Sequence, residues 1–273
     1  MGCRCIGDYE PSGKVWMKTK QVAVEIASYP KSGNTWMLHL LHQFLRSRGV
    51  SVSGLAPDIH LDPAAVDNLE FFQLGSHRYG FYKSHIPGNP KTLPDIIVYI
   101  YRHPLDVFLS AINHHARNGN AWIFFDDKPR TVEQISADGD MESYFECFLE
   151  NLGANYWSEM LGELSCVRAH TESGLDQCRV ALRYEDLFVR RGEALREVLQ
   201  ALEIPVSEDL EPVFERADLK TVGSGNPFFW RARTRTREEF LSADQISLFE
   251  RKHGSWLERL GYLSADGEAG EDR

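Results

Sequence analysis

A lysine-bearing turn lies between an alternating apolar run and a helical pattern near the start of the chain. The run from Val22 to Ser28 predicts a strand, and apolar residues at helical spacing follow the turn from Lys31 to Thr35. Backbone N–H groups at a helix start have no intrahelical partner, and the helix dipole adds partial positive charge there. Gly33 permits close approach to a ligand, and Lys31 adds a full charge. The stretch predicts a cradle for phosphate or a similar anion.

The order of residues in this turn separates it from the common nucleotide-triphosphate loop. In that loop, G-x-x-x-x-G-K-[ST], the lysine follows the last glycine, whereas Lys31 precedes Gly33 here. The order argues against a P-loop nucleotide or small-molecule kinase, which is kept as the alternative enzyme. A non-catalytic nucleotide-binding module is a third hypothesis, although His85 two residues after Lys83 supplies a base that a mere binder does not need.

Four short motifs in this order resemble those of the PAPS-dependent sulfotransferases of the cytosolic and bacterial type. The stretch YPKSGNTW, residues 29 to 36, is similar to the family's phosphosulfate loop Y-P-K-S-G-T-T-W, with Asn34 as the one departure. KSH at residues 83 to 85 resembles the K-T-H motif of the catalytic base. Arg102, Pro104 and Ser110 have the spacing of the 3′-phosphate motif, and YED follows at residues 184 to 186.

The resemblance implies a metal-free, in-line transfer of a sulfuryl group from 3′-phosphoadenosine 5′-phosphosulfate (PAPS) to a hydroxyl, or an amine, of a small molecule, leaving adenosine 3′,5′-bisphosphate (PAP). It assigns general-base catalysis to His85, with Lys31 neutralising the bridging oxygen and Lys83 assisting at the sulfuryl oxygens. The expected donor-binding residues form one set: Lys31, Ser32, Gly33, Asn34, Thr35, Trp36, Arg102, Ser110, Tyr184, Arg231 and Arg233.

Some of these roles have alternatives. Trp36 offers a flat face for adenine or is a core residue, and Tyr184 touches the adenine or closes a strand end. The family's R-K-G triplet over the 3′-phosphate is absent, so Arg231 or Arg233 takes its place, because alternate residues share a face. The family's C-terminal dimerisation motif is not recognisable, so no oligomeric state is carried over.

The acceptor pocket is expected in three loops, 49–80, 118–140 and 223–240. Their aromatic residues indicate an acceptor that is apolar or aromatic in part. The 223–240 stretch also carries alternating arginines.

Strands that alternate with helices must position these groups, which predicts an α/β fold with one central, mostly parallel sheet flanked by helices. The run from Asp95 to Pro104 predicts a strand buried on both faces, and residues 177–187 a later strand and turn. Turns after Ser28, Tyr101 and Leu182 should converge, because ligands in such folds bind beyond the carboxyl ends of the strands. One long helix is expected over 141–164 and a surface loop over 118–140.

The composition of the chain limits which ligands and which cellular compartment can be expected. A net charge of −10 excludes a broadly basic nucleic-acid-binding surface, so an anionic ligand needs a local basic pocket. Five scattered cysteines favour a reducing compartment, and neither a signal peptide nor a membrane span is recognisable, so we expect a cytoplasmic protein that does not bind membranes. Residues 1–263 are expected to form one sulfotransferase domain, and 264–273 a disordered acidic tail.

Overall fold

The computed structural model describes residues 19–52, 63–119, 128–218 and 233–263. Within them, a five-stranded sheet has the order β2-β3-β1-β4-β5. Its strands are β1 (Gln21–Ser28), β2 (Phe72–Leu74), β3 (His77–Ser84), β4 (Ile96–Tyr101) and β5 (Val180–Arg183). The expected acidic tail, 264–273, lies outside the described residues, as do the aromatic side chains expected at 122–125 and 228–230.

The sheet is parallel except at one edge. β3, β1, β4 and β5 are parallel neighbours, and only the short β2 pairs antiparallel, with β3. The register places Ala27 beside Ser84, Ser28 beside Ile100, and Tyr101 beside Arg183, so four strands end at one edge. The prediction of an α/β fold with a mostly parallel sheet is confirmed.

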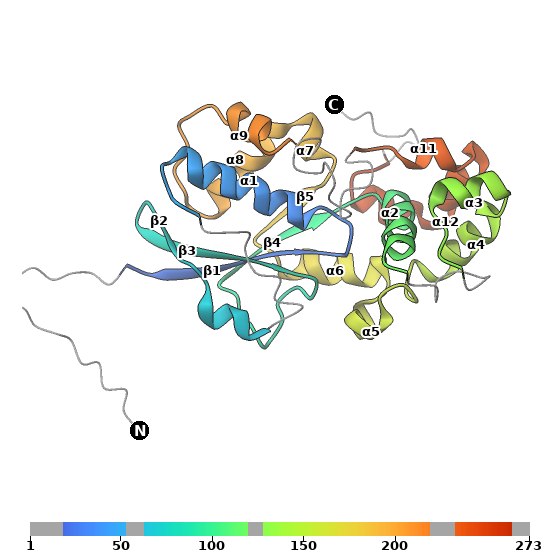
Figure 1. The fold of residues 1–273 in the computed structure, drawn as a ribbon, viewed down its shortest axis with the longest axis horizontal. Helices are drawn as coiled ribbons and strands as arrows, with labels where there is room; N and C mark the ends of the chain where they lie inside the picture. The colour runs from blue at the N-terminus through green and yellow to red at the C-terminus, as the bar shows by residue number, and fades with distance from the viewer. Residues whose placement is uncertain (1–18, 53–62, 120–127, 219–232, 264–273) are drawn as a thin grey trace, which may run out of the picture.

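Helices cover both faces of the sheet and its carboxyl edge (Figure 1). On one face lie α1 (Asn34–Ser47), α7 (Asp186–Val189), α8 (Arg191–Ala201) and α9 (Glu211–Arg216). The opposite face is covered by α6 (Val167–Gln177), which contacts β1 and β4. Beyond the carboxyl ends lie α2 (Pro104–Arg117), α3 (Val132–Asp138), α4 (Met141–Asn151), α11 (Arg237–Phe240) and α12 (Ala243–Arg259). Short turns complete the order: η1 (Pro63–Asn68), α5 (Ser158–Leu161) and η2 (Gly162–Leu164).

Two large apolar cores hold these layers together. One joins α1, α8 and α9 to the sheet and includes Val24, Ile26 and Leu41. The other joins α2, α4 and α12 around Phe108 and Phe148, whose stacked rings lie 4.7 Å apart. Since β1, with Tyr29 directly after it, contributes to both cores, the cradle that follows it is anchored from two sides.

The prediction of a single helix over 141–164 is wrong. α4 ends at Asn151, because Leu152 and Gly153 both have positive φ, at 50° and 79°. Gly153 lets the chain pass close to Tyr29, whose hydroxyl donates to the Gly153 carbonyl at 3.3 Å. The surface loop expected over 118–140 contains α3, and α6 was not predicted at all.

In the described part of the chain, no helix combines the length and the apolar character that a membrane span requires. Three cysteines there, Cys147, Cys166 and Cys178, are free thiols.

Candidate active site

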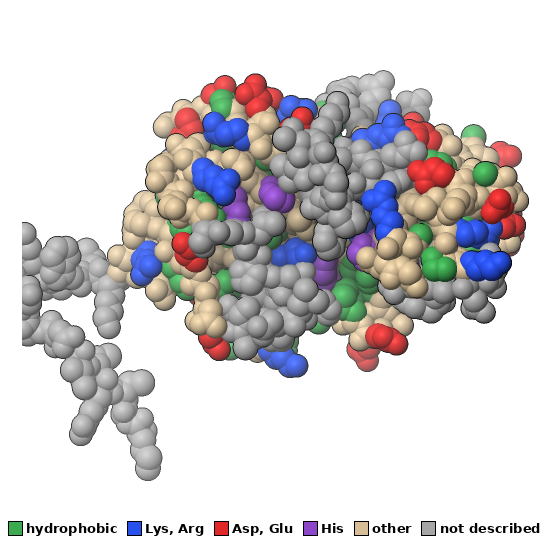
Figure 2. Space-filling model, in the orientation of Figure 1, with side chains coloured by type: hydrophobic (Ala, Val, Ile, Leu, Met, Phe, Trp, Pro, Cys, Tyr) green, Lys and Arg blue, Asp and Glu red, His purple; other side chains and the backbone are tan. Residues whose placement is uncertain are grey.

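The turns that carry the four motifs follow neighbouring strand ends. Residues 29–33 follow β1, His85 follows β3, Arg102 follows β4, and Tyr184 follows β5. The convergence expected for the turns after Ser28, Tyr101 and Leu182 is confirmed, and the turn after β3 joins them, because all four strands run parallel. Figure 2 shows Lys, Arg and His side chains gathered across the middle of one face, between the two halves of the molecule.

The cradle is a tight turn that leads directly into α1. Ser32 donates its N–H to the Tyr29 carbonyl at 3.1 Å, and Lys31 takes a left-handed φ of 72°. Gly33 is the N-cap of α1 with a φ of 111° and gives the helix no side-chain cap. The first N–H groups of α1 therefore have neither an intrahelical partner nor a capping side chain, which is the arrangement that binds anions.

Tyr184 lies between the cradle and Arg102. A Cβ atom on Gly33 would come within 2.4 Å of the Tyr184 ring, so only glycine lets the cradle approach so closely. On the same ring, the Arg102 guanidinium lies 4.5 Å from the centroid, a cation–π contact. Trp36 meets Tyr184 edge-on and donates its indole N–H to the Ala217 carbonyl at 3.1 Å.

Arg102 connects three segments that are distant in sequence. Its Nη1 donates to the Lys31 carbonyl at 3.3 Å, and its Nη2 donates to the Arg233 carbonyl at 3.0 Å. Its Nε–H is buried and has no hydrogen-bond acceptor within the described ranges. Arg233, which also pairs with Glu239, is thus brought beside Arg102. Arg231 lies outside the described residues.

One face of α2 is turned toward this region. Asp106 near the start of α2 forms a buried ion pair with Arg237 at 2.8 Å. Ser110 and His114 follow at intervals of four residues, and residues so spaced share a helix face. Burial lowers the pKa of His114 to about 3, and the charge of Lys31 is the next cause.

His85 is held against the end of β1. Its Nδ1 lies 2.8 Å from the Ser28 carbonyl, which can only accept, so Nδ1 carries the proton. The neutral ring then has its lone pair on Nε2. Asn34 makes a parallel connection, because its amide donates to the Ser84 carbonyl at 3.3 Å. Base and cradle are therefore joined by two hydrogen bonds across neighbouring strand ends.

Positive charge is concentrated around the cradle. Burial first, and then Arg102, Lys83 and Arg117, lower the pKa of Lys31 from 10.5 to about 7. The charged form of this lysine is disfavoured by its surroundings, and an anion among the same groups would favour it.

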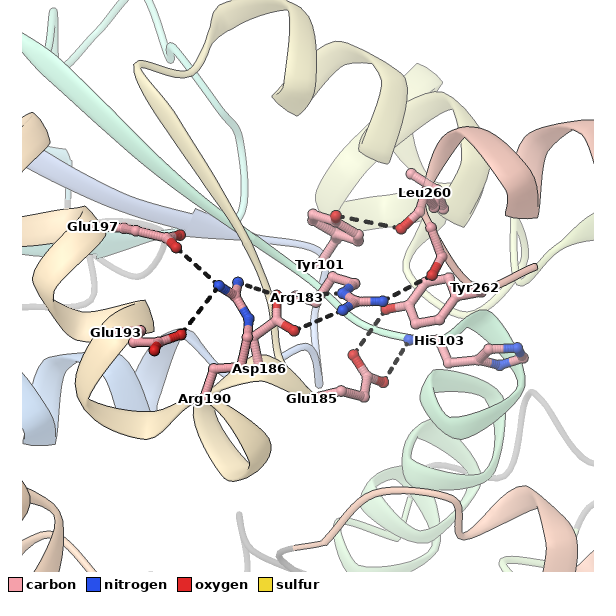
Figure 3. Close-up of polar contacts among 11 residues, drawn as sticks. Tyr101, His103, Arg183, Glu185, Asp186, Arg190, Glu193, Glu197, Leu260 and Tyr262 are labelled. Carbon is pink, nitrogen blue, oxygen red and sulfur yellow. Dashed lines mark hydrogen bonds and ion pairs between the residues drawn. The ribbon is translucent and has the colours of Figure 1, made fainter. Parts of the chain in front are cut away.

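A polar network fixes the turn that carries Tyr184 (Figure 3). Glu185 is buried and accepts from the His103 backbone N–H at 3.1 Å and the Tyr262 hydroxyl at 2.8 Å. Asp186 accepts from Arg183 at 2.8 Å and from Arg190 at 3.2 Å. These bonds tie the end of β5 to the start of α2 and to the segment that follows α12. They place Arg102 and Tyr184 against each other.

Sequence reasoning missed several members of this arrangement. Asp106 could have been found from the sequence, because it stands four residues before Ser110 and therefore shares its helix face. No local pattern indicates its partner Arg237 or the buried His170 behind His85, because their contacts span 131 and 85 residues. In the described part of the chain, no three His, Cys, Asp or Glu side chains are grouped to hold a metal ion.

Comparison with known proteins defines the class. The family model of the sulfotransferase domain matches residues 23–260, so the chain belongs to the sulfotransferase family, as its motifs indicated. Its activity is therefore sulfuryl transfer, and the enzyme class predicted from the sequence is confirmed.

A solved structure has the same fold. Mouse sulfotransferase SULT7A1, in a crystal structure complexed with PAP, is 16% identical with a TM-score of 0.60, over 90% of this chain and 86% of that chain. Retinol dehydratase in complex with androsterone and the inactive cofactor PAP is also 16% identical, over 86% of this chain and 80% of that chain. Its TM-score of 0.43 is too low to support an argument. No curated protein sequence matches this chain.

Proposed function

We propose that this sulfotransferase moves a sulfuryl group from PAPS to a hydroxyl, or alternatively an amine, of a small-molecule acceptor, with His85 as the general base. One observation carries the proposal. The lysine cradle and the imidazole of His85 lie at neighbouring strand ends and are joined by the His85–Ser28 and Asn34–Ser84 hydrogen bonds. An anion-binding group and a base are thereby held in a fixed relation, which an in-line transfer requires.

The donor would be held at its two anionic ends. The 5′-phosphosulfate would be bound by Lys31 and by the backbone N–H groups of residues 32–36, which include those of Ser32, Thr35 and Trp36. Arg102, Ser110 and an arginine of the 231–233 segment take the 3′-phosphate. The buried Nε–H of Arg102, which lacks an acceptor within the described ranges, supports this assignment. Tyr184 lies between the two ends and contacts both Arg102 and Trp36, so its ring and that of Trp36 are the ones that the adenosine would meet.

The transfer step follows from the tautomer of His85. The acceptor oxygen attacks sulfur while the bond from sulfur to the bridging oxygen breaks, and PAP leaves with that electron pair. The acceptor's proton passes to Nε2 of His85, since Nδ1 already holds a proton for the Ser28 carbonyl. Lys31 neutralises the charge that develops on the bridging oxygen, and Lys83 assists at the sulfuryl oxygens.

An acceptor that is apolar or aromatic in part fits the side of the site formed by the end of α2. The rings of His114 and His115 lie 5.4 and 4.4 Å from that of Trp157, and the cations of the cradle act on His114. These three rings are tilted against one another, and we propose that they line the acceptor side of the site. We further propose that residues 1–263 form the catalytic domain and that the protein is cytoplasmic. The three free thiols in the described part of the chain support a reducing compartment.

Nucleotide selectivity tests the donor assignment. PAP is expected to raise the melting temperature, because a ligand that binds only the folded state stabilises it by mass action, and ATP is expected to do so far less. EDTA should leave the PAP shift unchanged, since the proposed contacts need no metal. Arg102→Ala should abolish most of the shift. An ATP shift as large as that of PAP would favour a kinase, and loss of the PAP shift in EDTA would refute metal-free binding.

Replacement of His85 tests the base. His85→Ala is expected to lower kcat by about 10²–10⁴-fold while PAP binding, measured by calorimetry, is unchanged. His85→Gln keeps a hydrogen bond without basicity and should be nearly as slow. In the wild type, kcat/KM should fall on the acid side as the imidazole is protonated.

His77→Ala, at the opposite end of β3, is the matched control and should retain wild-type activity. Labelled PAPS with a panel of phenols and alcohols supplies the assay. An alanine variant at position 85 that keeps most of its activity on the best acceptor would show that another group is the base.

A further inference from the structure

A second histidine, His170, lies directly behind the candidate base. It is on α6 and is fully buried. Its Nε2 is 2.9 Å from the His85 carbonyl oxygen, and its Nδ1 is 2.8 Å from the Tyr99 hydroxyl. Because a carbonyl only accepts, Nε2 carries the proton and donates it, and Nδ1 is left to accept from Tyr99. Burial lowers the pKa of His170 to about 4, which keeps this ring neutral at neutral pH.

His170 also touches the strand that carries the cradle. Its ring meets the ring of Tyr29 edge-on, with 5.3 Å between centroids. Tyr29 lies two residues before Lys31, and its hydroxyl donates to the Ser165 carbonyl at 2.8 Å. One buried side chain on α6 therefore contacts both the residue that bears the base and the strand end that bears the cradle.

Two hydrogen bonds therefore hold His85 in place. Its ring donates to the Ser28 carbonyl, and its own carbonyl accepts from His170. The ring bond fixes the tautomer, and the Asn34 amide holds the main chain at the preceding residue, Ser84. The bond from His170 holds the main chain at His85 itself, and with it the Cα from which the imidazole projects.

We propose that His170 is a positioning residue for the sulfuryl transfer: through the His85 carbonyl it holds the base in register with the Lys31 cradle. The proposal rests on the proposed role of His85. A displacement of about 1 Å between reacting groups can cost about 100-fold in rate, so an anchor of this kind matters even though it touches no substrate.

Two amide variants separate positioning from packing. The oxygen of the asparagine in His170→Asn can replace Nδ1 as the acceptor for Tyr99, but its amide is too short to reach the His85 carbonyl. The longer side chain in His170→Gln places an amide N–H near the former position of Nε2. With PAPS and 2-naphthol as the probe acceptor, His170→Asn should lower kcat by about 10- to 100-fold, while His170→Gln should recover most of it. The Kd for PAP should be the same in both.

A readout that needs no acceptor keeps this test separate from the proposed function. In ¹⁵N-histidine NMR, the signals of His85 are identified by their loss in His85→Ala. Wild type should show a single Nδ1–H tautomer, and His170→Asn a mixture of tautomers, because the loosened turn weakens the bond to Ser28. Absence of transfer to any acceptor in the wild type would count against the proposed function and leave this comparison intact.

His253→Asn is the matched control. His253 is a buried histidine on α12 whose Nε2 lies 3.3 Å from the Leu149 carbonyl, so the variant removes a similar bond away from the site. It should leave kcat and the His85 signals unchanged. If His170→Asn does not fold, Tyr99→Phe, which removes the donor to Nδ1, is expected to give a smaller change in the same direction. Folded His170→Asn, or folded Tyr99→Phe where it is used instead, with wild-type kcat and an unchanged His85 tautomer would overturn the proposal.

Discussion

Charge and burial conflict at Lys31. It is surrounded by Arg102, Lys83 and Arg117, and its pKa falls to about 7. An ordinary surface lysine would be fully charged at pH 8, whereas most Lys31 side chains are neutral there without a ligand. Because a neutral lysine is not repelled by the neighbouring cations, Lys31 can lie among them at a small electrostatic cost before an anion binds.

Donor binding should therefore take up a proton. An anion bound at the cradle raises the pKa of Lys31, so at pH 8 about one proton should enter with each PAP. Calorimetry in two buffers of different ionisation enthalpy measures this uptake as a difference in apparent binding enthalpy. Lys31→Gln should bind PAP more weakly and show little uptake. Equal enthalpies in both buffers for the wild type would contradict the assignment.

At the scale of elements, one ion pair fastens the C-terminal segment to the start of α2. Arg237 donates to Asp106 from both its backbone N–H and its guanidinium, each at 2.8 Å, and Asp106 is fully buried. The same segment brings the Arg233 carbonyl to Arg102. The pair therefore stabilises the fold and also holds a main-chain partner of the proposed 3′-phosphate arginine in place.

Breaking this pair should affect stability and donor binding together. Arg237→Met leaves the Asp106 carboxylate buried without its cation, which should lower the free energy of unfolding by roughly 3–5 kcal/mol. PAP should also bind more weakly, because the Arg233 segment loses its anchor. Chemical denaturation and calorimetry measure the two effects.

Arg259→Met is the comparison for this experiment. Arg259 pairs with Glu172 at 2.7 Å on the surface, where such pairs contribute only about 0–1 kcal/mol. If Arg259→Met and Arg237→Met were equally stable and bound PAP equally well, the Asp106–Arg237 pair would have neither role.

At the scale of the whole molecule, a buried carboxyl in the central strand links stability to pH. Glu25 lies in β1, is fully buried, and accepts from the Gly88 backbone N–H at 3.0 Å. Burial raises its pKa from 4.5 to about 7, against the smaller lowering by its hydrogen bonds to Ser84 and Gly88. Between these two pH values the folded state binds more protons than the unfolded state, so its stability falls as pH rises.

Glu25→Gln should remove this dependence. Above pH 7 the variant is expected to be more stable than the wild type, by on the order of 1–3 kcal/mol, because no charge has to be buried. Below about pH 4.5 the two should be equally stable, since the wild-type carboxyl is then protonated in both states. Denaturation curves at pH 4, 6 and 8 measure the difference. A difference that does not change with pH would show that Glu25 does not titrate in this range.

The parts of the fold that depend on near neighbours in the chain were predictable. The cradle and the strands β1, β4 and β5 that end beside it carry their signals in alternation, spacing and turn residues. The capping box of α3, Thr131 with Gln134, was an equally local signal that was overlooked, so this helix was mistaken for a loop. The break after α4 left a weaker trace, because Gly153 marks it but Leu152 with positive φ does not.

The sequence by itself thus determined the sheet and the enzyme family, and it was enough to propose the anion cradle and the base. Only the tertiary structure decided what surrounds them: His170 behind His85, Arg237 on Asp106, and the cations that lower the pKa of Lys31. These contacts join residues far apart in the chain, and nothing in the neighbouring sequence specifies them. Packing of the helices around the sheet creates them, and the same packing excludes the water that would otherwise screen the charges.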